Sequence, residues 1–79
     1  MEDLIAAMQE NQRQAEVAYD AMCDARPSAA RECFDDARGF LAKAIDLARQ
    51  AGLDDAVARL TVRADRVVKV YNSQFRNIW

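Results

Sequence analysis

The chain has 79 residues, of which 52% are hydrophobic and 30% are charged, and its formal net charge is −2. This length supports one small domain, and the apolar content is too high for a disordered chain. With two glycines and one proline, the sequence is also too poor in turn residues for an all-β fold. The composition therefore predicts a single helical domain that covers residues 1–79.

Three segments of helical periodicity follow one another along the chain. They cover about residues 2–25, 27–51 and 54–78. Because the joints between them are very short, consecutive helices are expected to run antiparallel. The sequence therefore predicts an all-α fold of three long antiparallel helices, an up-down-up bundle that dimerisation could complete.

Residues at the second joint suit the end of one helix and the start of the next. Gly52 is well placed to adopt the left-handed conformation after the second helix, with Leu53 packing back on its last turn. Asp54 is expected to cap the third helix, and Asp55 to interact favourably with its dipole. At the first joint, Pro27 suits an opening turn, where its missing N–H costs no hydrogen bond.

The second helix has the most regular apolar pattern. Alanine recurs every seven residues, at Ala30, Ala37, Ala44 and Ala51, and the alternate positions are Phe34, Leu41 and Ala48. A seven-residue repeat is typical of coiled-coil packing, and alanine lets a neighbouring backbone come close. The apolar arc is wide enough to contact two neighbours, so this helix is predicted to be the central one.

Charge is unevenly distributed along the chain. Residues 1–26 contain six acidic and two basic side chains, whereas residues 53–79 contain five basic and three acidic ones. The two ends are therefore expected to attract each other, within one molecule or between two. The basic surplus is too small to predict nucleic-acid binding.

Apolar side chains outside the predicted core indicate a candidate interface. On the third helix, Val62 and Val70 flank Arg66 on a basic side, and Val17 lies similarly outside the apolar face of the first helix. Trp79 ends the chain, where it would be ordered only by packing on its own bundle or on a second chain. These five residues are the predicted interaction surface.

The two cysteines allow two readings. Cys23 and Cys33 fall on the predicted core faces of two helices near their joint, where free cysteine packs as a small hydrophobic residue. A disulfide between them, or between two chains, is the alternative. Most aromatic side chains, including Phe34, Tyr71 and Phe75, are expected at this same end of the bundle.

The residues that most enzymes depend on are missing from the sequence. It contains no histidine, the commonest general base and metal ligand, and no glycine-rich phosphate loop. We therefore assign no catalytic, cofactor-binding or metal-binding residues and expect neither an enzyme nor a cofactor. The sequence also has no recognisable signal peptide and no long apolar run, so we expect a cytoplasmic protein that does not span a membrane.

These observations favour a non-enzymatic helical module for protein–protein interaction, with itself as the expected partner in a homodimer. An alternative is an adaptor that binds a partner's helix in a groove of the bundle, because Asn11 and Gln12 interrupt the apolar face of the first helix. A third, weaker hypothesis is binding of a small molecule or lipid between the helices. The apolar pattern of the three helices is also compatible with exchange of the first helix between two chains.

Overall fold

The computed structural model describes residues 2–76, so the predicted interface residue Trp79 lies outside the described part of the chain. Three long helices follow one another, α1 (Glu2–Asp24), α2 (Pro27–Gln50) and α3 (Asp54–Tyr71). A short turn of π-helix, η1 (Asn72–Arg76), continues directly from α3. The three predicted helices are therefore confirmed.

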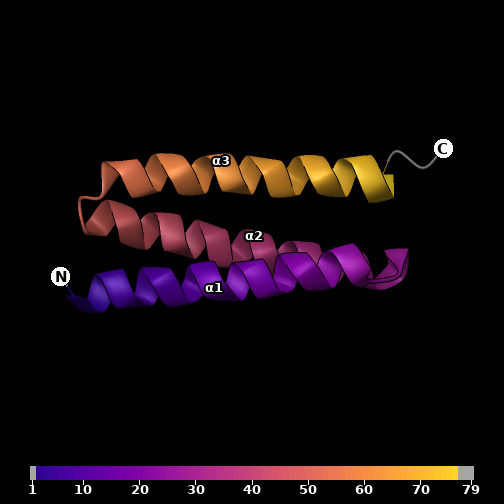
Figure 1. Ribbon diagram of the computed structural model, residues 1–79, viewed down its shortest axis with the longest axis horizontal. Helices are drawn as coiled ribbons and strands as arrows, with labels where there is room; N and C mark the ends of the chain where they lie inside the picture. The colour runs from indigo at the N-terminus through magenta and orange to yellow at the C-terminus, as the bar shows by residue number, and fades with distance from the viewer. Residues whose placement is uncertain (1, 77–79) are drawn as a thin grey trace.

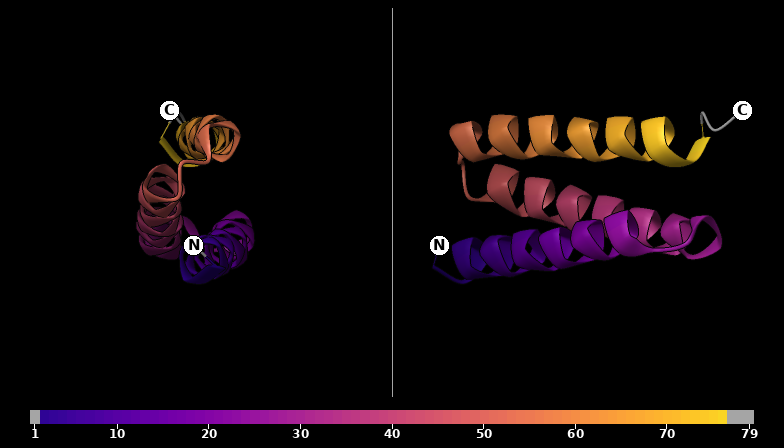
Figure 2. Two further views of the ribbon diagram at one scale, coloured as in Figure 1. Left: turned by 90° about the vertical axis from the view of Figure 1, so that its left-hand side faces the viewer. Right: turned by 45° about the vertical axis from the view of Figure 1, so that its right-hand side comes forward.

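The helices run up, down and up, with α2 in the middle (Figure 1). The molecule is elongated, with principal extents of 45 × 17 × 12 Å. Close backbone contacts join α1 to α2 and α2 to α3. Viewed along the helices, the three form a bent row in which α1 and α3 both pack on α2 and leave one side open (Figure 2). The predicted bundle with a central second helix is confirmed.

The core is built from a seven-residue repeat in all three helices. In α2 the predicted alanines Ala30, Ala37, Ala44 and Ala51 are all buried, as are Phe34, Leu41 and Ala48. The outer helices contribute buried residues at the same spacing, Met8, Ala15 and Met22 from α1 and Leu60 and Val67 from α3. The small alanine side chains buried on α2 let the neighbouring helices pack close to it.

Gly52 ends α2 in the predicted way. Its φ of 73° is left-handed, and its N–H donates to the carbonyl of Arg49 at 3.1 Å. The N–H of Leu53 donates to the carbonyl of Ala48 at 2.9 Å, which completes a Schellman motif. The prediction that Asp54 caps α3 is wrong. Leu53 occupies the cap position, so Asp54 is the first helical residue and interacts with the helix dipole instead.

The aromatic side chains gather at the end of the bundle where α2 begins and α3 ends, as predicted. The rings of Phe34 and Tyr71 stack with their centroids 4.0 Å apart and 7° between their planes, and Phe75 lies 5.5 Å beyond Tyr71. The α-helical part of α3 ends at Tyr71, earlier than the predicted residue 78, because the turn that follows is π-helical. Nothing in the local sequence explains this widening.

Candidate interaction surface

The open side of the bent row is a groove between α1 and α3. At one end, Ile5 and Gln9 of α1 face Leu53 and Ala56 across a space of about 790 Å³. Further along, a smaller hollow of about 300 Å³ lies between α1 and α3. It is lined by polar side chains of α1 and basic side chains of α3, namely Gln12, Glu16, Arg59, Arg63 and Arg66, together with Leu60 and Val62.

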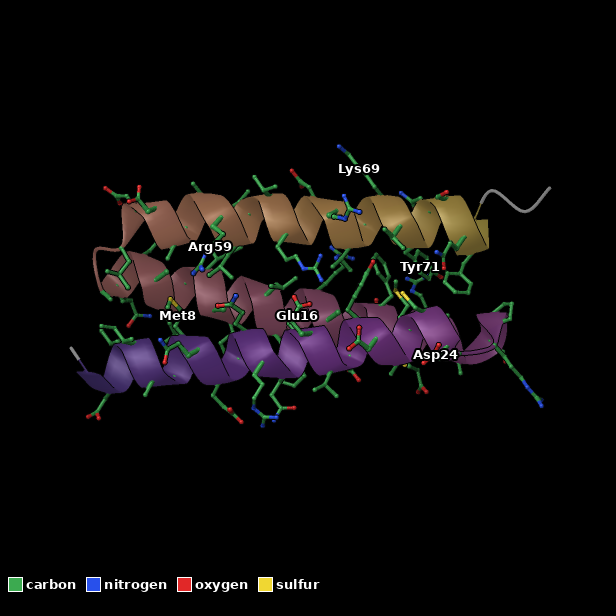
Figure 3. All side chains as sticks on the ribbon, in the orientation of Figure 1. Met8, Glu16, Asp24, Arg59, Lys69 and Tyr71 are labelled. Atoms are coloured by element: carbon green, nitrogen blue, oxygen red, sulfur yellow. The ribbon has the colours of Figure 1, made fainter. Side chains whose placement is uncertain are left out.

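One side-chain cluster bridges this groove. The guanidinium of Arg63 on α3 donates two hydrogen bonds to the carboxylate of Glu16 on α1, at 2.8 and 2.5 Å. The same guanidinium lies 4.7 Å from the centre of the Tyr19 ring, a cation–π contact. Glu16 points from α1 toward the other two helices (Figure 3). Within residues 2–76, no other side-chain hydrogen bond joins two helices.

The ion pair changes the titration of both partners. Hydrogen bonds from Arg63 lower the pKa of the Glu16 carboxyl below its usual value, against the smaller opposing effect of partial burial. The hydrogen bonds to Glu16 raise the pKa of Arg63 above its usual value. Because the folded-state pKa of Glu16 is depressed, the pair stabilises the fold above the unfolded-state pKa of about 4.3. That contribution is lost as the pH falls through the folded-state pKa.

We expect Glu16→Gln to lower the free energy of unfolding at pH 7 by about 0.2–1 kcal/mol, a small effect because both side chains are partly exposed to solvent. The difference from the wild type should shrink as the pH falls below about 4.3, where the unfolded chain takes up the proton before the folded one, and it should be lost once the pH falls through the lowered folded-state pKa of Glu16. Urea unfolding followed by circular dichroism at several pH values measures this. Glu32→Gln, on the exposed face of α2, is the control. A pH-independent difference would contradict the assignment.

The structure places three of the predicted interface residues along one groove on α3 and the fourth, Val17, on α1. Val17 and Val62 are exposed, at 55% and 68%, and belong to different helices at opposite edges of the row. Arg66 is exposed beside Val62, and a shallow groove of about 560 Å³ runs along α3 past both of them and Val70. Val70 itself is half-buried against the core, so the expectation that it lies outside the core is wrong in part.

The cysteines differ from each other. Both are free thiols, and Cys33 is half-buried against the core as expected. Cys23 is exposed, so the prediction that it lies in the core is wrong. The core position at this level of α1 is taken by Met22, which is fully buried, and the next residue on a helix points about 100° away.

Neither a metal site nor a membrane span is found in the described range. No helix there is long and apolar enough to cross a bilayer, and no three potential metal ligands come together. Comparisons with known proteins gave no match, because no family model, no curated protein and no solved structure is significantly similar to the chain.

The sequence did not predict that Glu16 pairs with Arg63. The excess of acid in the first third and of base in the last third does predict attraction between α1 and α3. Which acid meets which base depends on how far α1 and α3 are shifted along their axes relative to each other. Glu16 and Arg63 are 47 positions apart in the sequence. The sequence carries no signal for that shift.

Proposed function

We propose that the chain is a non-enzymatic helical module for protein–protein interaction that associates with copies of itself, with a homodimer as the first assembled species. The observation that carries this proposal is the exposure of Val17 and Val62, the two large hydrophobic side chains that the described residues leave open to solvent. They lie on α1 and α3, the two helices at the edges of the row. A second copy would cover these side chains.

The composition of the core supports self-association. In the part of the chain that the structure describes, six of the thirteen buried hydrophobic residues are alanines, which bury little apolar area each. Hydrophobic stabilisation scales with buried apolar area, at about 25 cal/mol per Å². A domain of this size with a small core gains from further burial against another chain. We further propose a cytoplasmic location, where free cysteines such as Cys23 and Cys33 stay reduced.

Size-exclusion chromatography with light scattering tests the proposal directly. We expect the mass to rise from the monomer value of 8.9 kDa toward twice that value as the concentration increases from micromolar to near-millimolar. A constant mass of 8.9 kDa over this range would overturn self-association.

A second candidate function is an adaptor that binds a partner's amphipathic helix in the groove between α1 and α3. The observation that favours it is the hydrogen bond of Asn11, whose Nδ2 donates to the carbonyl of Ala7 at 2.8 Å within the same helix. The polar interruption in α1 therefore does not tie α1 to α2 through this residue. This candidate requires a monomer with a free groove, so the same light-scattering experiment distinguishes the two functions.

A further inference from the structure

We draw no further inference here: the strongest candidate, the open groove between α1 and α3, carries none, because the acidic and basic side chains that line it are equal in number and nothing in the structure shows what covers it.

Discussion

Replacing Leu60 with alanine is expected to lower the free energy of unfolding by about 2–5 kcal/mol. Leu60 is fully buried and is one of the four largest side chains with almost no solvent exposure in the described core. Its removal leaves a cavity where α3 packs on α2, and the rigid helices close such a space only in part. Because small domains are stable by only about 5–15 kcal/mol, this loss is a large fraction of the total and should lower the urea midpoint clearly. Urea titration followed by circular dichroism measures this loss.

A matched control lies two residues further along the same helix. Val62→Ala removes apolar atoms from an exposed position, so its free energy of unfolding should stay within about 0.5 kcal/mol of the wild type. Both variants are compared at low protein concentration, where the chain is expected to be monomeric. Equal urea midpoints for Leu60→Ala and Val62→Ala would show that α3 does not pack on the core as described.

Enlarging one of the buried alanines of α2 is the second change with a large expected effect. Ala44→Leu inserts three carbon atoms at a fully buried position of α2, where the neighbouring helix is held close by the small side chain. Overpacking of a well-packed core costs about 1–3 kcal/mol, and the separation of two long helices raises this cost toward the upper end. Thermal unfolding should show a clearly lower midpoint.

Ala42→Leu provides the comparison, because Ala42 lies on the exposed side of the same helix. Alanine and leucine are both strong helix formers, so the exposed substitution should be nearly neutral. A loss of stability confined to the Ala44 variant would identify close helix packing as the cause. If Ala44→Leu were as stable as Ala42→Leu, the helices would not pack closely at the buried alanines of α2.

Much of the fold was predictable from the sequence because helix periodicity is a local property. The recurrence of Ala30, Ala37 and Ala44 defines which face of α2 is buried, whatever packs against it. Gly52 ends α2 because glycine adopts the left-handed conformation that is costly for other residues. The end of the helix is therefore also determined by residues close together in the sequence. Short joints then leave an antiparallel path as the only one available.

The candidate surface was less predictable, because it depends on how separate helices are rotated and aligned. The rotation of α1 about its own axis decides that Met22 rather than Cys23 enters the core, because neighbouring residues point about 100° apart. The relative height of α1 and α3 decides that Glu16 meets Arg63. Such choices are made by packing against α2, and no pattern within α1 or α3 alone records them.

The sequence alone determined three helices, their order and the central place of α2, since each follows from residues close together in the chain. Only the tertiary structure decided that the row is bent and open on one side, and that Val17 and Val62 lie at opposite edges. The physical reason is that an amphipathic helix specifies which of its faces is buried. It does not specify which neighbour buries that face, or what remains exposed once three helices have packed.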